Sequence, residues 1–161
     1  MKRLRLYLDT TVWNFAFADD APIYQKATVE FFERVRSGAF EIFESSAVAE
    51  EIDGAPERRA KQIAALMAEV SPTRLALVPE IERLAELYLK RKALPKRSRA
   101  DAFHVAYATF YRVDILLSWN FKHLANVNRR SKLVAVNLEE GYGQALEIVT
   151  PLGVLNSEES T

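Results

Sequence analysis

Short apolar runs alternate along the chain with longer stretches in which apolar residues recur every three or four positions. Three of the runs are typical of buried strands: Leu4–Leu8, residues 40–43 and residues 115–119. Two weaker strand candidates, residues 75–78 and 147–150, are each closed by a proline. The pattern therefore predicts five strands spread over the whole length of the chain.

The stretches between these runs have helical spacing. Pro22 is placed to begin the first helix. The last helix, around Ala106, is apolar nearly all round, so we expect it to be deeply buried. The predicted apolar faces are Tyr24, Ala27, Phe31 and Val35; Ile63, Leu66, Met67 and Val70; Ile81, Leu84, Ala85 and Tyr88; and Phe103, Ala106, Tyr107 and Phe110. Strands alternating with helices predict an α/β protein with a mostly parallel sheet covered on both faces.

Length and composition indicate one globular domain. The chain has 161 residues, of which 49% are hydrophobic, and this is enough for a sizeable core. We expect the domain to cover residues 1–155 and the polar segment 156–161 to be a disordered tail. No apolar stretch approaches the ~18 residues that span a bilayer, so no membrane partner is expected. The absence of cysteine fits a reducing, cytoplasmic location.

An acid, Asp9, directly follows the first predicted strand. In open α/β sheets, ligands bind at the carboxyl ends of the strands, so Asp9 is a candidate site residue. The alternative is that Asp9 caps a helix beginning near Thr10, because Asp is a favoured N-cap residue.

Two further acids occupy similar junctions. Glu51 follows the second strand and borders the buried face of a predicted helix; the alternative is a solvated surface acid. Asp101 lies in the most apolar helix, where an ionised carboxylate is costly unless a cation or a salt bridge from Arg97 or Arg99 compensates it. His104, one turn further along, is either a contact to the same site or a hydrogen-bonded core histidine.

Asn120 ends another strand, in a position that mirrors Asp9, although an Asn there also suits a turn or a helix cap. Oxygen ligands suit Mg²⁺ and Mn²⁺. A zinc site is disfavoured because the chain has no cysteine and two histidines. Taken together, these residues predict a Mg²⁺ or Mn²⁺ site at which metal-bound water attacks a phosphate ester.

The formal net charge is zero, but the basic residues are unevenly distributed. Residues 90–99 contain lysines and arginines and no acid, and a second basic group comprises Lys122, Arg129, Arg130 and Lys132. Such runs are usually solvated surface, but these two flank Asp101 and Asn120, where cations would hold phosphates. The candidate nucleic-acid-binding residues are Lys96, Arg97, Arg99, Lys122 and His123.

Several aromatic residues lie near the same predicted edge. They are interpreted either as platforms for unpaired bases or, as is more usual, as core residues. They are Tyr7, Trp13, Phe15 and Trp119.

Four segments, in order, resemble the PIN domain family, which includes the VapC-type ribonuclease toxins of bacterial toxin–antitoxin systems. They are residues 6–12 (Leu-Tyr-Leu-Asp-Thr-Thr-Val), 46–52 (Ser-Ala-Val-Ala-Glu-Glu-Ile), 99–106 (Arg-Ala-Asp-Ala-Phe-His-Val-Ala) and 116–120 (Leu-Leu-Ser-Trp-Asn). The resemblance implies a three-layer α/β/α fold with a central, mostly parallel five-stranded sheet. It also implies a Mg²⁺- or Mn²⁺-dependent ribonuclease.

The resemblance also implies residue roles and partners. It makes Asp9, Glu51 and Asp101 the catalytic metal ligands, and Thr10 and Ser118 their supporting residues. The chain departs from the family at the fourth acidic position, which is Asn120, and this loss of charge should weaken binding of a second cation in particular. Residues 119–123 indicate a PIN-like subgroup distinct from typical toxins. The expected partners are single-stranded or looped RNA, an antitoxin protein and a second copy of the chain in a homodimer.

Two other functions remain open. Asn120 supports a PIN-like module that binds RNA or a protein partner without cleaving it. A phosphotransfer enzyme of the haloacid-dehalogenase type also has an Asp after its first strand, but such enzymes need a second Asp two residues later, where this chain has Thr11.

Overall fold

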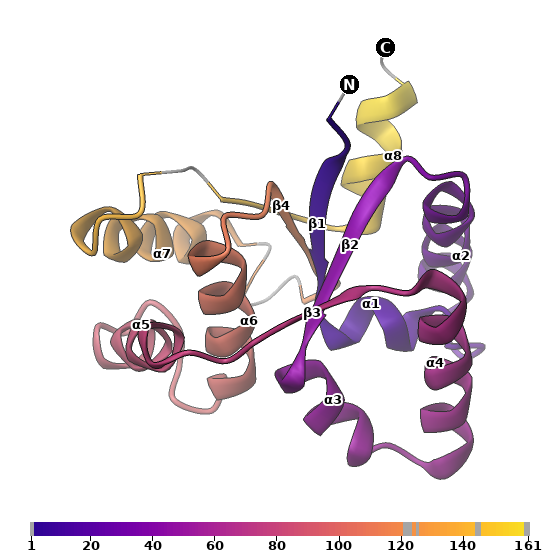
Figure 1. The fold of residues 1–161 in the computed structure, drawn as a ribbon, viewed down its shortest axis with the longest axis horizontal. Coiled ribbons are helices and arrows are strands. Elements are labelled where there is room, and N and C mark those ends of the chain that lie inside the picture. Colours follow the sequence, from indigo (N-terminus) through magenta and orange to yellow (C-terminus); the bar gives the residue numbers. More distant parts are fainter. Residues whose placement is uncertain (1, 121–123, 125, 144–145, 160–161) are drawn as a thin grey trace.

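A five-stranded sheet runs through the centre of the protein, whose structure is a computed structural model describing residues 2–120, 124, 126–143 and 146–159 (Figure 1). The strands are β1 (Leu4–Leu8), β2 (Phe40–Ser45), β3 (Thr73–Leu75), β4 (Ile115–Leu117) and β5 (Glu147–Val149). Their order is β3-β2-β1-β4-β5, and all neighbouring strands are parallel. The predicted α/β fold with a parallel five-stranded sheet is confirmed.

The strand positions differ from the predicted ones chiefly at β3, which was expected at residues 75–78. Only Leu75 belongs to both ranges. Leu77 is exposed, and Val78 is the N-cap of the next helix, which begins at Pro79. β4 ends at Leu117 rather than at residue 119. Ser118 N still donates to Val149 O of the neighbouring strand β5, whereas Trp119 N donates to a side-chain oxygen, Thr11 Oγ1.

Eight helices are described in the structure. They are α1 (Thr10–Phe15), α2 (Pro22–Arg36), α3 (Ser46–Asp53), α4 (Glu57–Val70), α5 (Pro79–Lys90), α6 (Arg99–Phe110), α7 (Val127–Glu139) and α8 (Pro151–Glu159). Pro22 begins α2 as expected, and α6 is the deeply buried helix that its composition predicted.

Two helices go beyond the sequence-based expectations. α7 coincides with the basic run at Arg129, Arg130 and Lys132, which obscured its short apolar face of Leu133 and Val136. α8 continues to Glu159, so residues 156–159 are helical where a disordered tail was expected. The buried residues Val154 and Leu155 anchor this helix, and a helix that has begun extends by one hydrogen bond per residue.

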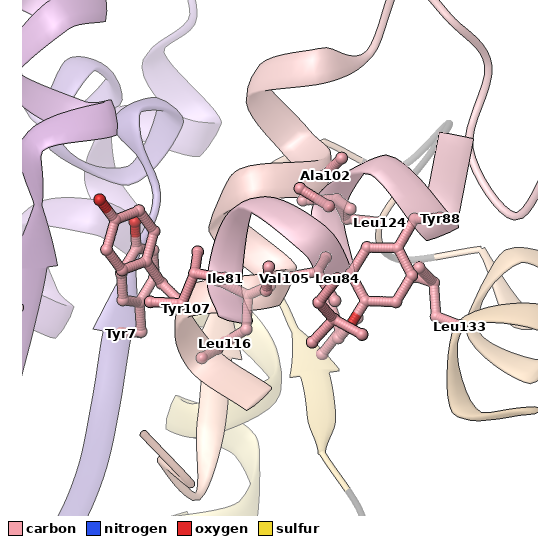
Figure 2. Packing of buried hydrophobic residues seen from close by; sticks show 14 of the residues in the cluster. Tyr7, Ile81, Leu84, Tyr88, Ala102, Val105, Tyr107, Leu116, Leu124 and Leu133 are labelled. Atoms are coloured by element: carbon pink, nitrogen blue, oxygen red, sulfur yellow. The ribbon is translucent and has the colours of Figure 1, made fainter. Parts of the chain in front are cut away.

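The helices form one layer on each face of the sheet, which gives the expected three layers (Figure 1). Helices α5, α6 and α7 cover one face, where Tyr7, Phe43 and Leu116 point into a core that also contains Tyr88 and Tyr107. Figure 2 shows this core, with Tyr7 beside Tyr107 at one end and Tyr88 near Leu133 at the other.

The second core lies on the opposite face of the sheet, beneath α1, α2, α4 and α8. Leu6, Leu8 and Leu117 point into it from the sheet, and Trp13 and Phe31 fill its centre. Alternation of side chains along β1 therefore divides the apolar residues between two cores.

The carboxyl ends of the central strands lie at one edge of the sheet, near α1 and α3 in Figure 1. Leu8 of β1 pairs with Leu117 of β4, so the residues that follow them, Asp9 and Ser118, leave the sheet at the same level. Within the described part of the chain, no helix is long and apolar enough to cross a membrane.

Candidate active site

Asp9 lies where β1 passes into α1, and only 1% of it is exposed. Its Oδ1 accepts hydrogen bonds from Thr11 N (3.0 Å), Thr11 Oγ1 (2.5 Å) and Val12 N (3.3 Å), so Asp9 is the N-cap of α1. Its Oδ2 accepts a hydrogen bond from Ser118 Oγ, at 2.5 Å. The cap that the sequence allowed is confirmed, and it occupies only one of the two carboxylate oxygens.

Glu51 is joined to the sheet by a chain of hydrogen bonds through His104. Thr10 Oγ1 donates to Glu51 Oε1 at 2.7 Å, and His104 Nε2 lies 2.6 Å from the same oxygen. His104 Nδ1 is 2.8 Å from the Tyr7 hydroxyl, which is 2.6 Å from Ser45 Oγ. The side chain of His104 is 2% exposed and that of Glu51 is 39% exposed. Glu51 therefore faces solvent at the rim of the site, while His104 forms its buried floor.

Asp101 lies in the first turn of α6, and its Oδ2 accepts a hydrogen bond from Asn120 Nδ2 at 2.8 Å. Asn120 N donates to Ser118 Oγ at 2.9 Å. Ser118 is therefore the link between Asp9 and Asn120. Arg99 forms an ion pair with Glu86 at 2.5 Å, so it does not supply the salt bridge to Asp101 that was one alternative.

Burial and the neighbouring charges shift the pKa values of Asp9 and Asp101. Burial raises the pKa of Asp9, even though His104 and the hydrogen bonds from Ser118 and Thr11 act to lower it. Burial also raises the pKa of Asp101 to about 6; His104 opposes this, and the negative charges of Asp9 and Glu51 add to it. Asp101 is thus half-protonated near pH 6, which an isolated surface Asp would not be.

His104 is the group that faces all three carboxylates. Burial alone would lower its pKa, but the hydrogen bond with Glu51 and the charges of Asp9, Glu51 and Asp101 outweigh burial, and the pKa is raised. Burial acts to raise the pKa of Glu51, but His104 and the Thr10 hydrogen bond reverse this and lower it. The protonated imidazole can donate Nε2–H to Glu51 and Nδ1–H to the Tyr7 oxygen, and it supplies positive charge to the acids.

The donor set fits Mg²⁺ or Mn²⁺ in its chemistry, because the acids offer hard oxygen ligands with excess negative charge. Glu51 Oε2 and Asp101 Oδ1 accept no hydrogen bond from any residue that the structure describes. As the side chains stand, however, no group of three or more Asp, Glu or His residues in the described ranges is arranged to hold a metal ion. Glu51 is turned toward His104, and Asp101 toward Asn120. Binding a cation at all three acids therefore requires these side chains to rearrange.

The candidate nucleic-acid-binding residues have different settings. Lys96 and Arg97 are exposed beside the start of α6. The guanidinium of Arg99 lies 5.4 Å from the centre of the Phe103 ring, in addition to pairing with Glu86. The predictions for Lys122 and His123 fall outside the described residues.

The aromatic residues near the edge belong to the core. Tyr7, Trp13 and Trp119 are buried, and Trp119 Nε1 donates to Thr28 Oγ1 at 2.9 Å. Phe15 is partly buried and packs against Trp119. Of the two interpretations of these residues, core packing is the one that the structure supports.

Sequence reasoning had singled out Asp9, Glu51, Asp101 and Asn120, and the structure brings all four to one edge. It had not placed Tyr7, Thr11 or Ser45 in the hydrogen-bond network, and it had left the role of His104 open. A signal for His104 was its spacing: it lies three residues after Asp101 and therefore on the same face of α6. Tyr7 precedes Asp9 by two residues, but nothing in the sequence marks its hydroxyl as a partner of His104.

The comparisons with known proteins concern the fold. No family model matches the sequence, and no curated protein matches it significantly. Among solved structures, the chain is similar to the crystal structure of VapBC2 from Rickettsia felis bound to a DNA fragment from their promoter, with a TM-score of 0.57 and 12% sequence identity. The match covers 90% of this chain and 98% of the matched chain. At this identity the likeness is one of architecture, and together with the parallel sheet it shows that the chain has a PIN-like α/β fold.

Proposed function

We propose that the protein is an endoribonuclease that depends on Mg²⁺ or Mn²⁺. The observation that carries the proposal is the convergence of Asp9, Glu51 and Asp101 at the carboxyl edge of the sheet, where burial, with a smaller contribution from the charges of Asp9 and Glu51, raises the pKa of Asp101 to about 6. A bound divalent cation would remove this repulsion. It would also supply an activated water molecule and neutralise charge on the scissile phosphate.

The surrounding residues have positioning roles in this proposal. Ser118 and Thr11 hold the Asp9 carboxylate, and Asn120 holds that of Asp101. Thr10 and His104 hold Glu51 at the rim of the site, and the Glu51 carboxylate would turn from His104 to reach a cation. Asn120 offers its amide oxygen as a weaker fourth ligand, because an amide carries no charge.

A basic pocket supports RNA as the substrate. Lys90, Lys92, Lys96 and Arg129 line a pocket of about 600 Å³ at the end of α5, together with apolar residues and no acid. It unites two basic runs that are far apart in the sequence. The C-terminal end of α5 offers a charge of only about −0.5, which does not neutralise four cations. The chain passes from this pocket directly into α6, which carries Asp101, so phosphates bound here would lie on the approach to the acids.

Thermal unfolding with and without Mn²⁺ tests the metal site. Mn²⁺ should raise the melting temperature of the wild type, because a ligand that binds only the folded state stabilises it. Asp101→Asn should reduce this shift and abolish cleavage of a labelled single-stranded RNA. Asp53→Asn, an exposed acid on α3, is the matched control and should behave as the wild type. Wild-type cleavage by an Asp9→Asn, Asp101→Asn double variant would refute the proposal.

A second candidate is a PIN-like module that binds RNA without cleaving it. Asn120 favours this function, because in the structure its amide donates to Asp101 and does not contribute a fourth carboxylate. Asn120→Asp decides between the candidates when tested in the same cleavage assay. A large gain of activity would show that the wild type is a weakened nuclease. Salt-sensitive RNA binding, with no cleavage by the wild type or by Asn120→Asp under any divalent cation, would establish the binding module.

The toxin role is a further part of the proposal, and its support is the likeness of fold to a chain of the VapBC2 complex. It predicts that expression of the chain slows bacterial growth and that Asp101→Asn removes the effect. Co-expression of an adjacent gene product that binds the chain should restore growth. Growth that is unaffected by active wild-type enzyme would exclude the toxin role and leave the nuclease proposal intact.

A further inference from the structure

A pocket of about 370 Å³ lies between α3 and α6, directly beside the candidate active site. Glu51 belongs both to the wall of this pocket and to the group of acids around His104. Whatever occupies the pocket is therefore next to the reacting centre. The other residues that matter here are Leu77, Phe103 and Tyr107, which form apolar walls, and Glu50 and Arg99, which are charged.

The walls of the pocket are held by contacts between elements. The Tyr107 hydroxyl is 2.8 Å from Ser46 Oγ, which ties α6 to the start of α3. Tyr111, at the end of α6, donates from its hydroxyl to Ala76 O at 2.7 Å, which fixes the segment that carries Leu77. Leu77 is nevertheless 46% exposed, so part of its apolar surface is open to a ligand in the pocket.

The charges exclude one class of occupant. Glu50 and Glu51 would repel a phosphate, and Arg99 already pairs with Glu86 and lies over Phe103. A neutral, flat group fits better, because Leu77 and the exposed part of Phe103 offer it apolar contact and the acids can accept hydrogen bonds from its edge. Nucleobases with an exocyclic amino group have such donors, and a carboxylate accepts from the amino group of cytosine.

We propose that this pocket binds an unpaired nucleobase of the RNA next to the scissile phosphate, and that Glu50 favours bases with an exocyclic amino group over uracil. The proposal rests on the proposed function, since it names a subsite of the same substrate. The volume of the pocket is within the range of small-molecule sites.

Fluorescence anisotropy with labelled oligocytidylate and oligouridylate, in EDTA so that no cleavage can occur, tests the subsite. The wild type should bind oligocytidylate about fivefold more tightly or better, since one good hydrogen-bonded pair is worth at least ~1 kcal/mol. Glu50→Gln should remove this preference, because an amide both donates and accepts. Leu77→Ser should weaken binding of both oligonucleotides about fivefold and leave their ratio unchanged. Leu138→Ser replaces a leucine on α7 that is 59% exposed, and this control should change neither quantity.

A second variant distinguishes loss of the binding site from misfolding of the protein. Phe103→Leu keeps an apolar side chain at a partly buried position, and it should weaken binding of both oligonucleotides while the melting temperature stays close to that of Leu138→Ser. The proposed subsite is wrong if both Leu77→Ser and Phe103→Leu bind RNA with unchanged affinity. It is also wrong if Glu50→Gln keeps the base preference of the wild type. Failure of the wild type to bind either oligonucleotide would overturn it as well.

The two proposals fail separately. If the wild type cleaves RNA but the pocket variants bind as the wild type does, the subsite is wrong and the nuclease stands. If the variants lose affinity and base preference but no divalent cation supports cleavage, the subsite stands and the nuclease proposal is wrong.

Discussion

Asp101 shows how a single residue reports on its surroundings. It lies in the first turn of an almost wholly apolar helix, is partly buried, and faces two other carboxylates, so its ionisation is unfavourable in the folded protein. The hydrogen bond from Asn120 and the nearby His104 offset only part of this cost.

Asp101→Asn should therefore stabilise the protein in the absence of divalent cations, and the effect should depend on pH. Because the pKa of this acid is raised from 3.8 to about 6, the wild type pays no penalty below about pH 4, and the penalty grows between pH 4 and 6 and is constant above. The gain in unfolding free energy should reach about 1–3 kcal/mol above pH 6. Urea unfolding in EDTA across this range measures it, with Asp53→Asn as the control. A variant that is less stable than the wild type at pH 8 would contradict the charge argument.

At the scale of elements, the residue that follows α5 has both an unfavourable backbone conformation and a positive charge in the basic pocket. Lys92 follows the helix in the left-handed region, with φ of 58°, and Ala93 N closes the turn on Tyr88 O at 2.9 Å. Glycine is the usual residue at this position of a helix end. The same conformation occurs after α4 at Ser71, with φ of 53°. Lys92 also lines the basic pocket, so its positive charge is placed there despite the backbone cost.

Comparison of Lys92→Gly with Ser71→Gly separates the effect of the left-handed backbone from the effect of the lysine charge. Both substitutions relieve the left-handed strain and should stabilise the protein by about 0.5–1 kcal/mol. Only Lys92→Gly removes a cation from the basic pocket, so it alone should reduce the salt dependence of RNA binding, by about 0.7 in the slope of log K against log salt. Unfolding curves and salt titrations of RNA binding measure the two effects. Equal salt slopes in both variants would contradict the phosphate-binding role of the pocket.

The whole molecule is organised around two cores that share one sheet. The core beneath α1, α2 and α4 is closed by α8, whose Val154 and Leu155 are buried. The C-terminal residues thus complete the same core that supports Trp13 and the first turn after Asp9. The stability of the candidate site therefore depends on residues at the far end of the chain.

Truncation tests this arrangement. A chain that ends at Thr150 loses Val154 and Leu155 together with the buried Pro151. Its unfolding free energy should fall by about 3–6 kcal/mol, at roughly 1.5–3 kcal/mol for each of Val154 and Leu155. A chain that ends at Asn156 keeps them and should lose less than about 1 kcal/mol, because the residues removed follow the buried Val154 and Leu155. Thermal and urea unfolding compare the two with the full chain. Equal losses in both truncations would show that the last turns of α8, and not Val154 and Leu155, hold the helix in place.

Sequence patterns predicted strands and helices correctly where apolar residues dominated a segment. The apolar runs located β1, β2 and β4, and the uniformly apolar stretch around Ala106 predicted the burial of α6. Prediction failed where two properties compete within one segment, as in α7, whose charged residues outnumber its buried ones. At β3 it shifted the strand into the following loop, because Leu77 is apolar but exposed.

The sequence by itself determined that Asp9 and Asn120 follow predicted strands, that Glu51 lies in the helix after the second strand, and that Asp101 lies near the start of a helix. In a parallel sheet this is enough to bring them to one edge, because all the strands end on the same side. Only the tertiary structure decided what each of them contacts. The bond from Ser118 to Asp9 joins residues 109 positions apart, and that from His104 to Glu51 joins residues 53 positions apart. Such contacts depend on strand register and on how α3 and α6 pack together, and no local pattern encodes these. The bonds of His104 to Glu51 and to Tyr7, and the turning of Asn120 toward Asp101, are therefore properties of the folded molecule alone.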